Sequence, residues 1–185
     1  MLWIFLLVVA VAVAWFIASY NGLVSLRNQA TNGWKQIDVQ LKRRHDLIPN
    51  LVETVRGAMK FEQNTLTQVI EARNKAIAAQ GVAEKATQEN VLTGALKQLF
   101  ALVENYPDLK SNQNVGKLQE ELVSTENRIG FARQFYNDIA TKFNTALQVF
   151  PTNMVAGMFS FKEAELFEIT DSAERSVPKV DLNIK

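Results

Sequence analysis

The residues best suited to chemistry stand together in His45-Asp46-Leu47-Ile48-Pro49, directly after three basic residues. His45 is the only histidine among 185 residues. A histidine followed by an acid and then a proline resembles the phospho-accepting site of sensor kinases. Here, however, Ile48 replaces the expected arginine, the proline comes one place early, and no nucleotide-binding pattern follows. A histidine phosphorelay through His45 is therefore the weaker hypothesis. The stronger one is a partly buried His45 that is hydrogen-bonded to a carboxylate or to backbone.

The basic triplet Lys42, Arg43 and Arg44 has two interpretations. It could bind anionic lipid or a partner, or its long stems could cover apolar surface while the charged ends stay in water. Arg44 falls on the apolar face of a predicted helix, so we expect it to pair with an acid across the bundle. The candidate acids are Glu62, Glu104, Glu121 and Glu126.

Composition excludes several kinds of site. The chain has no cysteine, which excludes disulfides, thiolate metal sites and cysteine nucleophiles. One histidine cannot supply the two Glu-x-x-His motifs of a di-iron bundle. Twenty Lys and Arg against 19 Asp and Glu give a net charge of +1, which offers no case for nucleic-acid binding. We assemble no nucleophile–base pair, phosphate loop or metal cluster, so we predict no catalytic, cofactor or metal residues and no enzyme.

The first part of the chain is a continuous apolar run, Leu2 to Ala18, which includes Trp3 and Trp15. These 17 residues would span roughly 26 Å as a helix, at about 1.5 Å per residue. The first charged side chain is Arg27, so the uncharged stretch can cover a hydrocarbon core of about 30 Å. A cleaved signal peptide competes, but no basic segment precedes the run, which is long for one. We expect a permanent single-pass anchor.

Basic residues follow the apolar run, beginning with Arg27 and Lys35 and continuing with the triplet, against a single acid, Asp38. The positive-inside rule then places the following domain in the cytoplasm and the N-terminus outside.

Apolar residues at alternating spacings of four and three predict three long helices. The first spans Ala30–Ala79, is kinked or restarted near Pro49, and ends at Gly81. The second spans Glu84–Tyr106 and the third Lys117–Phe150, and each is stopped by the following proline. Ser111 or Asn112 is expected to cap the third helix. The amides of Asn50, Asn137 and Asn144 lie near the seams and are expected to fix helix register.

The segment after Pro151 is too apolar at its start for a solvated tail. Phe159, Phe161 and Phe167 lie in a stretch that suits either a short helix or an extended segment. They are candidate contacts with a partner or a second copy if they are exposed, and core residues if they are not.

Several stretches together resemble the LemA family of bacterial membrane-anchored proteins. They are YNGLVSLRNQATNGWKQIDVQLKRRHDLIPNLVETVRG, TLTQVIEAR, LFALVENYPDLKSNQN, LQEELVSTENRIGFARQFYN and FPTNMVA. The resemblance covers Tyr20 to about Val180. It implies an N-terminal anchor in the bacterial inner or cell membrane, followed by an antiparallel helical bundle. It supplies no catalytic residues.

We therefore predict an all-α protein with an anchor and juxtamembrane segment at 1–26, a bundle at 27–170 and a polar tail at 171–185. The bundle is elongated and antiparallel, with three long helices and a short helical or irregular C-terminal segment. Its expected role is that of a non-catalytic scaffold or adaptor that contacts lipid through its N-terminal helix. Expected partners are copies of itself and another membrane protein.

Overall fold

The computed structural model describes residues 1–57, 59 and 62–168. These residues contain helices and no strands, which confirms the all-α prediction. The helices are α1 Leu2–Arg56, α2 Gln63–Ala78, α3 Gly81–Val103, α4 Pro107–Lys110, α5 Gln113–Gln148 and α6 Thr152–Met158.

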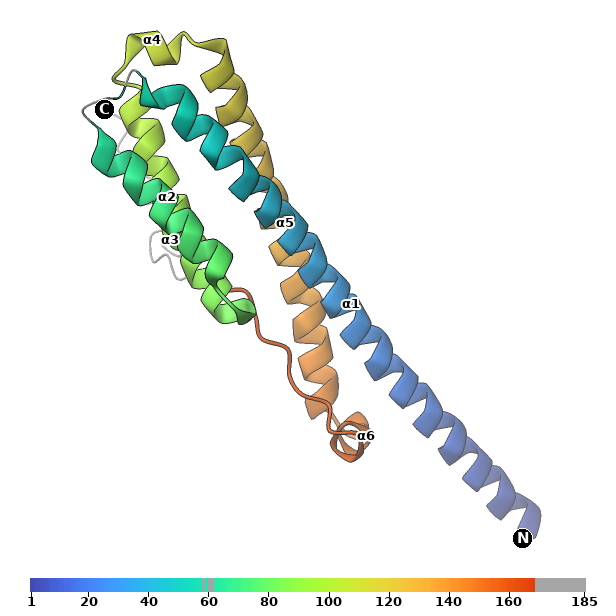
Figure 1. Cartoon of the computed structure of the whole chain (residues 1–185). Helices are drawn as coiled ribbons and strands as arrows, with labels where there is room; N and C mark the ends of the chain where they lie inside the picture. The colour runs from blue at the N-terminus through green and yellow to red at the C-terminus, as the bar shows by residue number, and fades with distance from the viewer. Residues whose placement is uncertain (58, 60–61, 169–185) are drawn as a thin grey trace, which may run out of the picture.

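Two antiparallel helix pairs make up the bundle, α1 with α5 and α2 with α3 (Figure 1). Small residues let α1 and α5 approach closely. A Cβ atom built on Gly33 would lie 3.4 Å from the Cα atom of Tyr136 and 3.4 Å from the ring of Phe135. Ala30 and Ala140 are buried along the same seam. Residue size at this seam thus sets the spacing of the pair.

The predicted first helix, Ala30–Ala79, is two helices in the structure. The chain stays helical through Pro49, so the predicted restart there is wrong, and α1 ends instead at Arg56. Gly57 follows, a weak helix former, and Met59 turns into the core with no exposed surface. The chain then reverses into α2, so the bundle has four long helices rather than three (Figure 1).

The remaining connections are short. Ala79 and Gln80 join α2 to α3, and Gly81 adopts a φ of +76°, a conformation that glycine tolerates best. The cap of α5 is Asn112, whose side-chain oxygen accepts hydrogen bonds from the backbone N–H groups of Asn114 at 2.9 Å and Val115 at 3.4 Å.

Buried apolar residues form three clusters along the bundle. The cluster farthest from the N-terminus joins all four long helices and includes Ile48, Leu92 and Leu122. The middle cluster is centred on Ile37 of α1 and Tyr136 of α5. The third joins Leu23, Phe143 and the helix α6, beside the point where α1 leaves the bundle.

After α6 an extended segment, residues 161–168, runs back along the bundle; we call it the strap (Figure 1). Of the two predicted conformations for this region, the extended one is therefore the one found. The predicted polar tail, 171–185, lies outside the described residues.

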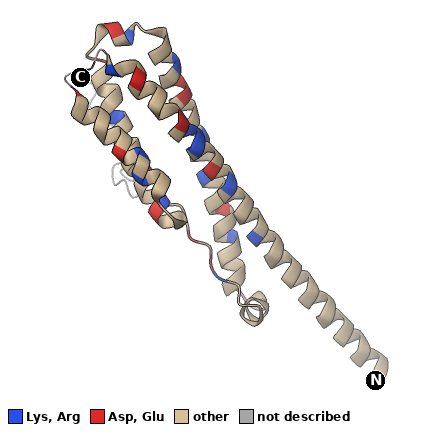
Figure 2. Ribbon diagram, viewed as in Figure 1, with Lys and Arg blue, Asp and Glu red and all other residues tan. Residues whose placement is uncertain are grey.

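The first part of α1 projects from the bundle with its apolar side chains exposed. Among the described residues, α1 is the helix that is long and apolar enough to cross a membrane, with a mean hydropathy of 2.6 over its best window. Leu2, Trp3 and Trp15 are 70%, 83% and 40% exposed, and Ala18 is exposed as well. Charged residues lie on the bundle and are absent from this projecting part (Figure 2).

Candidate functional site

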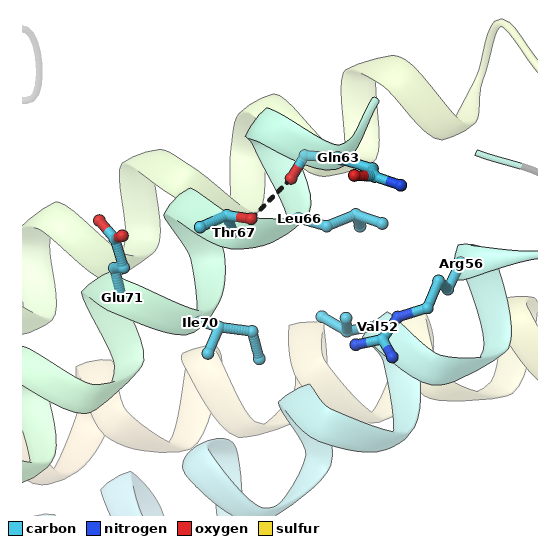
Figure 3. Close-up of a pocket in the computed structure, with 7 residues that line it drawn as sticks. All are labelled: Val52, Arg56, Gln63, Leu66, Thr67, Ile70 and Glu71. Carbon is cyan, nitrogen blue, oxygen red and sulfur yellow. Dashed lines mark hydrogen bonds between the residues drawn. The ribbon is translucent and has the colours of Figure 1, made fainter. Parts of the chain in front are cut away.

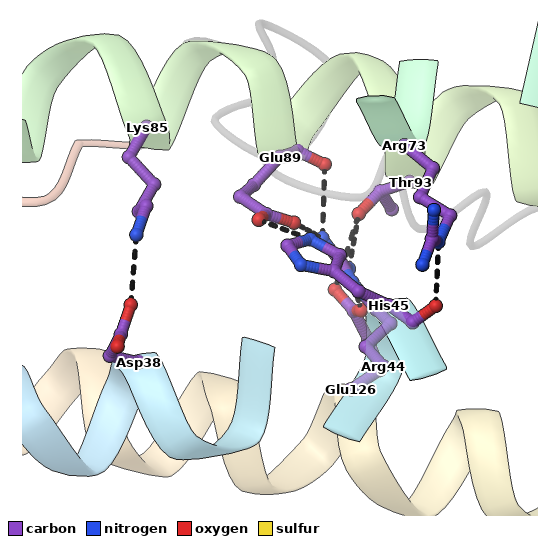
Figure 4. Close-up of polar contacts among 8 residues, drawn as sticks. All are labelled: Asp38, Arg44, His45, Arg73, Lys85, Glu89, Thr93 and Glu126. Carbon is purple, nitrogen blue, oxygen red and sulfur yellow. Dashed lines mark hydrogen bonds and ion pairs between the residues drawn. The ribbon is translucent and has the colours of Figure 1, made fainter. Parts of the chain in front are cut away.

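A buried charged cluster joins three helices around Arg44 (Figure 4). Arg44 and His45 face inward from α1 and are only 1% and 7% exposed. The Arg44 guanidinium forms ion pairs with Glu89 of α3 and Glu126 of α5. It also donates to the hydroxyl oxygen of Thr93 at 2.9 Å. His45 Nε2 lies 2.8 Å from Oε1 of Glu89, so one carboxylate binds both neighbours on α1.

The charges of this cluster compensate one another. Burial alone would raise the pKa of Glu89, but the hydrogen bond with His45 and the charge of Arg44 outweigh burial and hold the pKa below its usual value of 4.5. Glu89 is therefore ionised at neutral pH although it is only 2% exposed. An unpaired charge at this depth would cost several kcal/mol, so each partner stabilises the other.

A proline explains one further contact of this cluster. Pro49 has no N–H, so the carbonyl of His45, four residues earlier, has no partner within α1. The Nε–H of Arg73 from α2 donates to that carbonyl at 2.7 Å (Figure 4). The His45 carbonyl, which has no partner within α1, thereby accepts a hydrogen bond that joins the two helix pairs.

Exposed ion pairs surround the cluster. Arg43 pairs with Glu121 at 3.3 Å, and both side chains are about half exposed. Lys85 of α3 pairs with Asp38 of α1 at 2.8 Å and lies 5.9 Å from the ring centre of Trp34. Pairs of this kind contribute little stability each, but they align α1 with its neighbours.

Two cavities lie near the cluster. One, of about 200 Å³, is lined by Arg44, Thr93 and Glu126 together with apolar residues of α3 and α5. The other, of about 410 Å³, lies between the end of α1 and the start of α2 (Figure 3). It is lined by Val52, Arg56, Gln63, Leu66, Thr67, Ile70 and Glu71. In the first cavity, the Thr93 hydroxyl donates to Oε1 of Glu126 at 3.5 Å and accepts from Arg44, so both side chains belong to the charged cluster.

The structure separates the members of the predicted basic triplet. Lys42 and Arg43 are exposed, whereas Arg44 is buried against two carboxylates and cannot reach a lipid headgroup. His45 is buried with Nε2 held by Glu89, a setting that does not favour phosphate transfer to the ring. Within the described ranges, no group of three or more His, Asp or Glu residues is placed to hold a metal ion.

A second polar site fixes the strap to α5. The Asn137 amide donates to the Phe167 carbonyl at 3.0 Å and accepts from the Phe167 N–H at 2.9 Å. Asn144, two turns later, makes the same pair of bonds with Ala164, each 2.8 Å long. These two amides therefore hold the strap by its backbone, a role different from the predicted helix register. The third, Asn50, is exposed.

Tyr136 adds a third backbone contact with the strap. Its hydroxyl donates to the carbonyl of Glu165 at 2.6 Å. Burial and the charge of Glu165 raise the pKa of Tyr136, so the hydroxyl keeps its proton and remains a donor.

The three candidate partner aromatics differ in exposure. Phe167 is 1% exposed and packs against Trp34, with ring centres 6.0 Å apart. Phe161 is partly buried against Tyr20 and Phe143. Phe159 is 49% exposed. Phe167 is thus a core residue and unavailable to a partner, because the strap folds onto its own bundle.

Sequence reasoning missed two members of the cluster although each left a signal. Glu89 lies three residues before Leu92, on the apolar stripe of α3, and a buried acid there matches a buried base on α1. Arg73 donates to the His45 carbonyl, which has no helical partner because Pro49 lacks an N–H. Of the four expected acids, only Glu126 contacts Arg44.

Comparison with known proteins places this arrangement in a family. A model of the LemA family matches residues 33–182. The chain is 26% identical to protein LemA of Metamycoplasma hominis over 90% of its own length and 77% of that protein. It is 24% identical to magnetosome protein MamQ 2 of Paramagnetospirillum magneticum, over 84% of the chain and 67% of the relative. Magnetosome protein MamQ of Magnetospirillum gryphiswaldense is 25% identical, over 80% of the chain and 64% of the relative.

Proposed function

The chain belongs to the LemA family, and we propose that it is a membrane-anchored, non-catalytic scaffold. The observation that carries the proposal is the continuity of α1. One unbroken helix provides both the exposed apolar stretch and a central helix of the bundle. Because the chain has no flexible joint between anchor and bundle, the bundle has a fixed direction relative to the membrane.

Internal pairing supports a structural role for the polar cluster. Arg44 and His45 are each bound to Glu89, and all three side chains are buried, which favours packing over reaction as their role. A cluster of this kind specifies how three helices meet.

The scaffold self-associates in the membrane plane. Anchored copies share one orientation, so identical faces lie at the same distance from the membrane. Phe131 and Phe135, one turn apart on α5, are 74% and 45% exposed and form the candidate contact with a second copy.

Crosslinking and size measurement of the full chain in mild detergent test self-association. We expect a species larger than a monomer that is weakened by Phe131→Ser, which leaves the contact of Phe135 with the α1–α5 seam intact. Val91→Ser on α3, which removes a 52% exposed apolar residue, is the matched control and should change nothing. A monomer at every concentration would refute self-association.

A further inference from the structure

We propose that the turn from α5 through α6, residues 149–159, inserts into the membrane interface as a second lipid contact beside the anchor. This proposal rests on the proposed anchoring by α1. The turn exposes five apolar side chains that the bundle does not cover. Val149, Phe150, Met154, Met158 and Phe159 are 47%, 78%, 61%, 70% and 49% exposed.

The position of the turn along α1 identifies the lipid bilayer as its occupant. The ring of Phe159 lies 4.6 Å from that of Tyr20 and 6.1 Å from that of Phe16. A hydrocarbon core of about 30 Å takes about 20 helical residues, so a core that begins at Leu2 extends to Asn21. Phe159 therefore lies at the depth where the hydrocarbon ends. Figure 1 shows α6 at the end of the bundle from which the apolar stretch projects.

The distribution of charge supports the same boundary. No charged residue occurs from Phe143 to Phe161, just as none occurs before Arg27 on α1. Arg27 lies six residues before Gly33, and Lys142 lies six residues after Tyr136, which Gly33 faces. Equal rise per residue in the two antiparallel helices then places both bases at one height. Below it, α6 and the projecting part of α1 carry no charge (Figure 2).

The strap becomes charged where it leaves this boundary. Lys162 and Glu163 follow Phe161 directly. The Arg27 guanidinium lies 5.3 Å from the ring centre of Phe161, so a base and an aromatic ring meet at the boundary. Bases beside an apolar surface are suited to the phosphate layer of a bilayer, and aromatic rings to its interface. A bilayer has one boundary, so it explains why the uncharged parts of α1, α5 and α6 all end at the same height. Binding of a second copy of the chain would not explain this shared boundary.

Depth-dependent fluorescence quenching tests the proposal on the full chain in lipid vesicles. The natural sequence has no cysteine, so Phe150→Cys and Met154→Cys each give one site for an environment-sensitive dye. Leu6→Cys in the anchor is the positive control. Val91→Cys on α3, at a 52% exposed residue two positions after Glu89 of the buried cluster, is the negative control. The quencher is a phospholipid with a nitroxide near the top of its acyl chain.

We expect loss of emission at positions 150 and 154, comparable to that at position 6, and none at position 91. Quenching at position 6 with none at 150 and 154 would overturn the second contact while leaving the anchor intact. No quenching at position 6 would show that the anchor itself is not inserted, and both proposals would fail. Quenching of 150 and 154 by a nitroxide-labelled second copy, without quenching by lipid, would show a protein occupant instead and overturn the proposal.

Discussion

Arg44 is held by carboxylates from two other helices, so α1, α3 and α5 meet at one guanidinium. Glu89 connects Arg44 to His45, and Arg73 connects the His45 carbonyl to α2. The four long helices of the bundle are therefore linked by one polar network inside an apolar core. Because burial makes any unpaired member costly, the network disfavours other ways of packing the same helices.

Replacing Glu89 by Gln should destabilise the bundle in a pH-dependent way. Glu89 has a lowered pKa in the folded state, so its carboxylate stabilises the fold above the ordinary value of 4.5. That stabilisation is lost as pH falls below 4.5 through the folded-state pKa. We expect Glu89→Gln to cost about 3 kcal/mol at neutral pH, the low end for a broken buried pair, because Arg44 keeps Glu126.

Urea unfolding of the full chain in detergent, followed by helical circular dichroism between pH 7 and pH 3, measures this cost. The difference between wild type and variant should shrink as the wild-type carboxylate becomes protonated. Glu53→Gln, which alters an exposed ion pair with Arg56, is the control and should show almost no difference. A cost for Glu89→Gln that is constant across this pH range would contradict the assignment.

Pro49 and Arg73 should be energetically coupled. Arg73→Met removes the donor to the His45 carbonyl and should cost about 1.5–3 kcal/mol, as for hydrogen bonds from charged groups. In a Pro49→Ala background, residue 49 regains an N–H that can bind the same carbonyl. The cost of Arg73→Met should then fall by about 1 kcal/mol in a double-mutant cycle. Equal costs in both backgrounds would show that the carbonyl does not need Arg73.

At the scale of elements, the strap is held to α5 by Asn137 and Asn144 through its backbone. Each amide both donates to and accepts from one residue of the strap, much as a neighbouring strand would. Phe167 then fixes the position of the strap by burying its ring. The strap therefore belongs to the bundle.

Asn137→Ala and Asn144→Ala should each loosen the strap, because each removes two hydrogen bonds. The expected cost is about 1–3 kcal/mol per substitution. Hydrogen exchange of the Ala164 and Phe167 amides should accelerate, while exchange in α1 stays slow. Asn50→Ala, at an exposed asparagine, provides the comparison. Unchanged exchange at Ala164 and Phe167 would show that packing alone holds the strap.

Periodicity predicted where the buried faces lie but not where the chain turns. The apolar spacing continues from α1 into α2 because both helices face the same core, so a helical hairpin and one long helix look alike. Gly57 was the local signal, yet glycines also lie inside helices here, as Gly33 and Gly94 do. For the strap, the sequence left a short helix and an extended segment as alternatives. Side-chain amides on α5 bind the backbone of the strap, and such partners leave no periodic pattern that would decide between the two.

The charged cluster around Arg44 was only partly predictable, because periodicity shows which residues are buried but not which residues they contact. A base on the apolar face of a helix is buried on folding and needs a carboxylate partner. The position of Arg44 in the sequence therefore predicted such a partner. Which carboxylate pairs with Arg44 depends on how far the helices are shifted along one another in the bundle. The unforeseen reversal after Gly57 changes the position of α2 and α3, which explains why Glu89 was overlooked.

At the scale of the whole molecule, α1 sets both position and direction. If the hydrocarbon core ends near Asn21, the remaining 35 residues of α1 extend about 52 Å from the membrane, at about 1.5 Å per residue. The α5–α6 turn lies at the end of the bundle from which the apolar stretch projects, and α4 lies at the opposite end (Figure 1). If the proposed anchoring holds, the sides of the bundle are available to neighbouring anchored copies and its far end to a partner away from the membrane.

The central claim is that the apolar stretch of α1 is a permanent anchor. The most direct test is the intact mass of the protein that remains in native membranes after an alkaline wash. We predict a membrane-retained species whose mass includes the apolar stretch Leu2 to Ala18. A protein released by the wash, or a retained species that lacks the mass of the N-terminal stretch, would contradict the account.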